Sequence, residues 1–242
     1  MSTAKDLVIL ALTKMHGGVC TAGIDAVGTW IRPVRPTAKH SGANQTITDY
    51  CLLPMDFFHH GKSHLVHGGV SRVWLSSHAP ANPHIEDWQL DLRQKPQFLR
   101  KLNDAEQLDF LASHSEAEVS GLVSDENRSL GLYLPESFSF SFAMNQAGSD
   151  ISVRTAFTIG GWRHSDHSCT DLRMRALGRC LLAKSSGAPR SLSQTDFERR
   201  GKHLTYLALG LSRRFRGKHW LLVIGVHTIP ELDVPINWGR LK

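Results

Sequence analysis

The sequence is poor in cysteine and has no long apolar run. No CxxC pair occurs, so a disulfide framework or a paired zinc motif is not indicated, and the cysteines are expected to be reduced and mostly buried. No stretch approaches the roughly 18 apolar residues of a membrane span, and the run from Leu7 to Leu12 is too short for a signal segment. We therefore expect a cytoplasmic protein without disulfides. The four cysteines are Cys20, Cys51, Cys169 and Cys180.

Low-complexity tracts are also missing. Of the 242 residues, 41% are hydrophobic and 21% are charged, which is the composition of a folded globular protein and excludes extensive disorder. This length suits either one large domain or two small ones.

Charge is distributed unevenly along the chain. Residues 1–121 hold 11 Lys/Arg and 12 Asp/Glu, whereas residues 122–242 hold 17 and 10. The segment 163–218 alone carries 13 basic and 4 acidic residues. A basic surface in the second half predicts a polyanionic partner, although a merely solvated basic surface has the same composition.

Short β-type segments separated by glycine-containing turns fill the first part of the chain. The segment 6–25 predicts a hairpin, and Trp30–Val34 predicts a short strand that Pro33 confines to a sheet edge or a strand end. The segments 51–58 and 64–75 continue the pattern. Short strands at regular spacing indicate a small β-barrel over residues 1–92.

A helical period follows and then gives way to strands. Apolar residues recur every three or four positions between Pro96 and His114, which predicts a helix and a helical connector over residues 93–122. Beyond it, Phe138–Phe142 alternates strictly, and 151–162 and 204–227 are rich in strand formers. We expect a mainly β protein in which residues 123–242 form a second small barrel.

The predicted hairpins over 6–25 and 204–227 have the same order of features. Each consists of an apolar run, a basic turn that contains glycine and a second apolar run. This likeness suggests an internal duplication, although unrelated hairpins can share it.

Three stretches resemble landmarks of a known family. They are LVILALTKMHGGVCTAGIDAVGTWIRPV near the start, PHIEDWQLDL in the middle and TDFERRGKHLTYLALGLSRRFRGKHWLLVIGVH near the end. Together they resemble the prokaryotic dual OB-containing domain family over nearly the whole chain. The resemblance implies two tandem OB-like barrels and a nucleic-acid-binding role, often in mobile or defence-related bacterial contexts. It supplies no catalytic residues.

Two basic segments carry the candidate nucleic-acid contacts. In the first barrel, Arg32, Arg35 and Lys39 follow or flank Trp30, which either stacks on bases or closes the barrel. In the second barrel, the turn of the last hairpin interleaves cations with aromatic rings, and repulsion among its like charges favours contact with a polyanion. The residues predicted in this turn are Arg213, Arg214, Phe215, Arg216, Lys218 and Trp220.

The segment 162–175 allows more than one reading. His164, His167 and Cys169 could in principle hold a metal ion, but a fourth ligand and paired spacing are missing. If the segment is a strand, alternation separates His164 from His167 and places Arg173 and Arg175 on one face, where both are predicted to contact nucleic acid. We predict no metal site here.

Other motifs are weaker. GKS at 61–63 lacks the first glycine of a phosphate-binding loop, since Asp56 stands in its place, and the histidines around it form a polar loop. Scattered carboxylates could converge on Mg²⁺ in an enzyme acting on nucleic acid. These carboxylates are Glu86, Asp87, Asp171 and Asp196.

The sequence thus favours a cytoplasmic nucleic-acid-binding module without a cofactor, acting beside a separate effector protein. A nucleic-acid- or nucleotide-processing enzyme and a protein-interaction adaptor are the alternatives, because this type of barrel hosts many functions.

Overall fold

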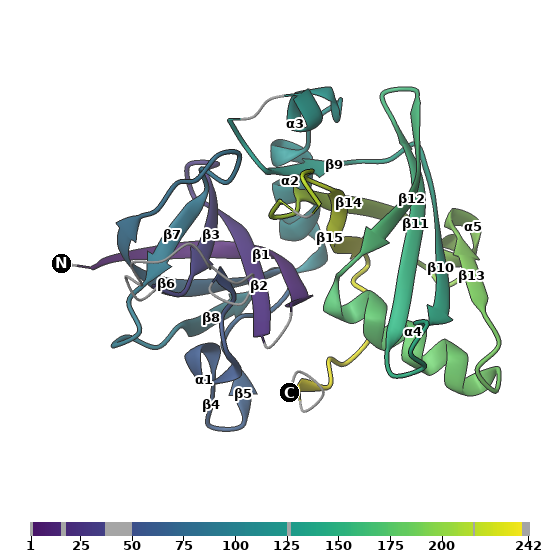
Figure 1. Cartoon of the computed structure of the whole chain (residues 1–242), viewed down its shortest axis with the longest axis horizontal. Helices are drawn as coiled ribbons and strands as arrows, with labels where there is room; N and C mark the ends of the chain where they lie inside the picture. Colours follow the sequence, from purple (N-terminus) through teal and green to yellow (C-terminus); the bar gives the residue numbers. More distant parts are fainter. Residues whose placement is uncertain (1, 16–17, 37–49, 125–126, 215, 239–242) are drawn as a thin grey trace. The chain divides into compact units, whose positions relative to one another are not determined.

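The computed structural model describes residues 2–15, 18–36, 50–124, 127–214 and 216–238 (Figure 1). The chain divides into two compact units. Unit 1 comprises Met1–Asn103, Glu126–Ser129 and Trp238–Lys242, and unit 2 comprises Asp104–Asp125 and Leu130–Asn237. In the described part of the chain, no helix is long and apolar enough to cross a membrane.

Unit 1 is built on a six-stranded sheet in the order β1-β2-β3-β7-β6-β8. An additional pairing between β1 and β6 closes the first five strands into a barrel. All of its pairings are antiparallel except the one between β3 and β7. The strands are β1 (Thr3–Met15), β2 (Gly18–Asp25), β3 (Trp30–Val34), β6 (Gly69–His78), β7 (Asp87–Leu90) and β8 (Gln97–Lys101).

The predicted hairpin and the predicted strand at Trp30 are both confirmed. Pro33 has no backbone N–H to donate, yet β3 lies between two strands. The pairing of β3 with β2 ends at Ile31, so the side of Pro33 that faces β2 requires no donor.

The segment after Cys51 is not the predicted strand. It forms α1 (Pro54–Phe57), followed by the two-residue strands β4 (Phe58–His59) and β5 (Lys62–Ser63). Pro54 occupies the first turn, and the carboxylate of Asp56 accepts a hydrogen bond from the Leu53 N–H at 2.8 Å. Both features favour a helix start, whereas the apolar composition of the segment had suggested a strand.

The predicted helix from Pro96 to His114 is wrong in its first half. Gln97–Lys101 forms β8 because its backbone pairs with β6, and the helix α2 begins only at Asp104. Pairing with a strand distant in sequence overrides the local helical period.

Unit 2 contains a seven-stranded sheet in the order β13-β10-β11-β12-β15-β14-β9. Its strands are β9 (Leu130–Tyr133), β10 (Ser137–Met144), β11 (Ile151–Ile159), β12 (Trp162–Cys169), β13 (Arg190–Ser193), β14 (Leu204–Leu211) and β15 (Leu221–Ile229). Its helices are α2 (Asp104–His114), α3 (Ser120–Ser124), α4 (Leu172–Lys184) and α5 (Gln194–Glu198).

The strand order of unit 2 repeats that of the first barrel. β10-β11-β12-β15-β14 corresponds to β1-β2-β3-β7-β6, and the parallel pair again joins the third and fifth strands, here β12 and β15. The first strand is divided: β10 pairs with β11, while β9 pairs with β14. Together β9 and β10 make the two pairings that β1 makes alone. Both units therefore have the OB strand order.

This correspondence corrects the suggested duplication of hairpins. The first hairpin forms strands one and two of its barrel, whereas β14 and β15 are strands four and five of theirs. The two hairpins are therefore not equivalent, although the two units share a strand order.

Strict alternation in β10 builds the core of unit 2. Phe138, Phe140 and Phe142 are buried, and the serines between them are exposed. The helix α4 packs against β10 and β11 and closes this core. Outward-facing side chains on β10 and β11 consequently form a polar surface.

Candidate nucleic-acid interface

The loop between β14 and β15 holds most of the predicted contacts that are exposed. Arg214, Arg216 and Lys218 are exposed, Arg213 is half-buried, and Trp220 is 50% exposed. Phe215 lies outside the described residues. We call residues 212–220 the basic loop.

Hydrogen bonds fix the base of the basic loop. The Ser212 N–H donates to the Trp220 carbonyl at 2.8 Å, and the Trp220 N–H donates to the Ser212 hydroxyl at 2.9 Å. At the tip, Arg216 and Gly217 have φ angles of 52° and 78°, which turn the chain sharply. The cations thus lie on a short turn whose two ends are joined by hydrogen bonds.

The basic loop lies beside the third strand of its barrel. Ser168 of β12 pairs with Leu222, two residues after Trp220, and the His167 ring nitrogen Nδ1 lies 3.2 Å from the Leu221 carbonyl oxygen. In OB barrels, the loop between strands four and five and the face of strands two and three form the usual ligand surface. The basic loop and the face of β11 and β12 occupy these positions in unit 2.

A bulge in β12 brings two histidines together. His167 pairs with Thr155 and His164 with Phe157, so β12 uses one residue more than β11, and Asp166 has a φ of 58°. The rings of His164 and His167 are 6.0 Å apart, and each packs on Phe157. The predicted separation of these histidines is therefore wrong. Burial and the neighbouring His167 ring lower the pKa of His164.

An arginine bridges the outer side of the bulge. The Arg154 Nε donates to a carboxylate oxygen of Asp166 at 2.7 Å, and its Nη1 donates to the Ser168 hydroxyl. The same arginine lowers the pKa of Asp166. Since its guanidinium is already engaged, Arg154 has a structural role on this face.

Two of the three predicted contacts of unit 1 have acidic partners. Arg32 is 8% exposed, and its Nε lies 2.6 Å from Oδ1 of Asp87. The Nε of Arg35 lies 3.0 Å from Oδ2 of the buried Asp56. Lys39 lies outside the described residues. Arg32 therefore presents little surface to a ligand.

Arg173 and Arg175 are not on a strand, because α4 begins at Leu172. Arg173 is buried, and its guanidinium donates to Glu231 at 2.5 Å and to the Val226 carbonyl at 2.8 Å. Arg175 forms an ion pair of 2.6 Å with Asp150. The two arginines tie α4 to its surroundings within unit 2.

The four scattered carboxylates each serve a structural hydrogen bond. Glu86 accepts from the backbone N–H and hydroxyl of Ser129, and Asp87 pairs with Arg32. Asp171 accepts from the Met174 N–H in the first turn of α4, and Asp196, in the first turn of α5, accepts from the backbone N–H and hydroxyl of the N-cap residue Ser193. Across the residues that the structure describes, no three His, Cys, Asp or Glu side chains converge as a metal site.

The two barrels differ in their exposed strand faces. Every residue of β2 except Cys20 is buried, and β3 is buried from Ile31 to Val34. In β12, by contrast, only Cys169 is buried, and Trp162 is 77% exposed. The strand face that binds ligands in OB barrels is therefore open in unit 2.

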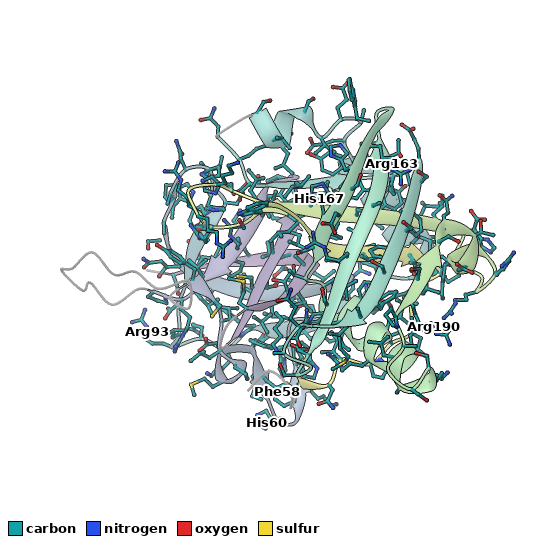
Figure 2. All side chains as sticks on the ribbon, turned by 45° about the vertical axis from the view of Figure 1, so that its right-hand side comes forward. Phe58, His60, Arg93, Arg163, His167 and Arg190 are labelled. Atoms are coloured by element: carbon teal, nitrogen blue, oxygen red, sulfur yellow. The ribbon has the colours of Figure 1, made fainter. Side chains whose placement is uncertain are left out.

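Sequence reasoning did not select Arg163 as a site residue, although it lies on this open face of β12 (Figure 2). It is exposed, and none of the ion pairs among the described residues includes it. The signal that could have found it is the GlyGly turn at 160–161, which places the next residues at the start of a strand.

The fold and this surface define a tandem pair of OB barrels. A family model described as "Dual OB-containing domain" matches residues 5–226. The chain therefore belongs to the dual OB-containing domain family. No match was found among curated proteins.

Proposed function

We propose that this protein binds nucleic acid through unit 2. The observation that carries the proposal is the basic loop, where Arg214, Arg216 and Lys218 are exposed at the position of an OB ligand loop. Three cations held on one short turn repel one another, and a phosphate backbone relieves that repulsion. Trp220 at the neck of the loop adds an exposed ring on which a base can stack.

The proposal is tested by fluorescence anisotropy with labelled single-stranded DNA, single-stranded RNA and duplexes. We expect binding that weakens steeply between about 0.05 and 0.2 M salt, since each phosphate contact releases counterions. An absence of binding to all of these nucleic acids at the lowest salt would contradict the proposal and favour a protein-interaction adaptor.

An accessory or sensor role beside a separate effector chain, including one in bacterial defence, stays a prediction of the family resemblance. Co-purification of an effector with the tagged protein before and after nuclease treatment tests it. Incubation with nucleic acids and divalent metal ions tests the enzymatic alternative, because a binding module leaves these nucleic acids intact.

A further inference from the structure

A small polar hollow lies on the outer face of the unit 2 sheet. It has a volume of about 100 Å³ and is lined by residues of β10, β11 and β12. Small-molecule pockets usually begin near 300 Å³, so this hollow suits a group of a few atoms. The lining residues are Ser137, Phe138, Ser139, Ala156, Phe157, Thr158 and Arg163.

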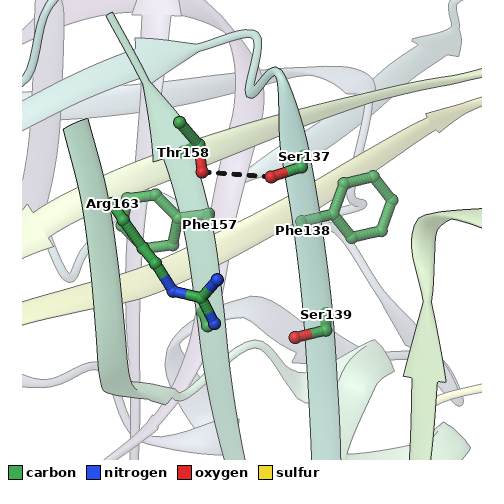
Figure 3. A pocket seen from close by; sticks show the side chains of 7 residues that line it. Ser137, Phe138, Ser139, Phe157, Thr158 and Arg163 are labelled. Atoms are coloured by element: carbon green, nitrogen blue, oxygen red, sulfur yellow. Dashed lines mark hydrogen bonds between the residues drawn. The ribbon is translucent and has the colours of Figure 1, made fainter. Parts of the chain in front are cut away.

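Hydrogen-bonding groups on three strands meet at the hollow. The Ser137 hydroxyl donates to the Thr158 hydroxyl at 3.0 Å. Figure 3 shows the guanidinium of Arg163 reaching across β11 toward Ser139. The Ser139 hydroxyl and the Arg163 guanidinium have no side-chain partner within the described part of the chain. The hollow thus offers hydroxyl groups and one guanidinium.

The local charge favours an anion. None of the lining residues is acidic. Glu136 directly precedes the lining residue Ser137 in the sequence. Its carboxylate accepts a hydrogen bond from the Gly161 N–H, in the turn between β11 and β12, at 2.8 Å. A guanidinium with neighbouring hydroxyls is the donor set that binds a phosphate group, because the planar fork matches two phosphate oxygens.

The outward residues of β10 and β11 beside the hollow include no aromatic ring. The outward residues of β11 are Ser152, Arg154, Ala156 and Thr158, and those of β10 begin with Ser137, Ser139 and Ser141. Stacking of bases requires aromatic side chains, whereas contacts to phosphate oxygens come from arginine and hydroxyl groups. This face therefore suits the sugar-phosphate backbone.

We propose, on the basis of the proposed function, that this hollow binds one backbone phosphate of a nucleic acid whose chain also contacts the basic loop. β12 connects the two places: Arg163 is its second residue, and Ser168 pairs with Leu222 near the loop. Five residue steps at about 3.3 Å give an upper bound of about 16 Å, since the bulge shortens the strand. One nucleic-acid chain of a few nucleotides covers that distance.

The variant Arg163→Gln tests the site, with Arg190→Gln as the matched control. Arg190 is an exposed arginine on β13 of the same sheet and does not line the hollow. In the salt titration, Arg163→Gln is expected to lower the salt slope by about 1 and the affinity at 0.05 M salt on the order of tenfold. Arg190→Gln is expected to change neither, and Ser139→Ala to lower the affinity about two- to fivefold without changing the slope.

A second measurement uses inorganic phosphate as the probe. In NMR titrations in a phosphate-free buffer, we expect saturable shifts of the Ser137, Ser139 and Arg163 amide signals that Arg163→Gln abolishes and Arg190→Gln retains. If the wild type binds nucleic acid but Arg163→Gln matches Arg190→Gln, the phosphate site is wrong and the proposed function stands. If phosphate binds at the hollow but no nucleic acid binds, the proposed function fails instead.

Discussion

Arg32 and Asp87 are register partners on the parallel strands β3 and β7, and their side chains form a buried ion pair of 2.6 Å. Fifty-five residues separate them in the sequence. The pair joins the two strands of the first barrel that run parallel among the residues that the structure describes. An arginine that sequence reasoning assigned to ligand contact thus has a partner inside the barrel.

Removing one member of this pair is expected to destabilise unit 1. Arg32→Ala leaves the Asp87 carboxylate buried without its cation, which should lower the free energy of unfolding by about 3 to 5 kcal/mol. Urea unfolding followed by circular dichroism measures the loss. The double variant Arg32→Met/Asp87→Leu should be less destabilised than Arg32→Ala, and the opposite order would contradict this role.

Asp171 is expected to stabilise unit 2 through both carboxylate oxygens. Oδ1 accepts from the Met174 N–H at 2.9 Å, and Oδ2 accepts from the Val226 N–H at 3.0 Å, linking the start of α4 to β15. Asp171→Ala removes the cap and leaves a buried N–H unsatisfied, which should cost about 2 to 4 kcal/mol. Asp171→Asn should also destabilise, since its amide cannot accept at both positions. Wild-type stability of both variants in urea would refute the role.

Gly178 on α4 is expected to resist substitution although alanine favours helices. A Cβ at this position would lie 2.7 Å from Cδ1 of Phe142 and 2.9 Å from Cγ2 of Ile151. Overpacking costs about 1 to 3 kcal/mol, which outweighs a helix-propensity gain of at most about 1 kcal/mol. Gly178→Ala should therefore lower the thermal midpoint, whereas Cys180→Ala on the exposed face of α4 should leave it nearly unchanged. A higher midpoint for Gly178→Ala would contradict the close packing.

The stacked rings of His59 and His64 are expected to make stability depend on pH. Their centroids are 3.6 Å apart, and Nδ1 of His64 accepts a hydrogen bond from the Phe98 N–H at 3.3 Å. Burial lowers the pKa of His64, and the nearby His59, His60 and Lys62 lower it further. The folded-state pKa lies below the ordinary value of 6.5, so the unfolded state binds more protons and stability falls as the pH drops through this region.

Urea midpoints at about pH 7.5 and 5.5 measure this effect while most carboxylates stay ionised. The wild type should be less stable at the lower pH, and His64→Gln should reduce the difference. His203→Gln, which changes an exposed histidine of unit 2, is the control. An equal pH dependence in wild type and His64→Gln would rule out His64 as the cause.

The alternation of apolar and polar residues along the sequence predicted the strands that have one polar and one apolar face. β10 is the clearest case, since its phenylalanines and serines fix both the strand and the direction of its faces. The cationic turn after β14 was also visible, because three cations within five residues repel one another. These features depend on neighbours in the sequence.

Features that depend on distant pairing could not be predicted in the same way. The β8 strand exists only through its pairing with β6, and the bulge that joins His164 to His167 requires the positive φ of Asp166. Arg32 and Arg173 carry no local sign that Asp87 and Glu231 will meet them across more than 50 residues. The sequence alone therefore does not show which acidic residue will pair with a given arginine in the fold.

The most direct test of nucleic-acid binding through the basic loop compares the salt slope of binding in two triple variants. Arg214→Gln/Arg216→Gln/Lys218→Gln changes the basic loop, and Lys184→Gln/Arg199→Gln/Arg200→Gln removes the same charge from other exposed positions of unit 2. We expect the slope to fall by about 3 for the loop variant and to stay at the wild-type value for the control. Equal slopes in the loop variant and the wild type would contradict the claim that unit 2 binds nucleic acid through this loop.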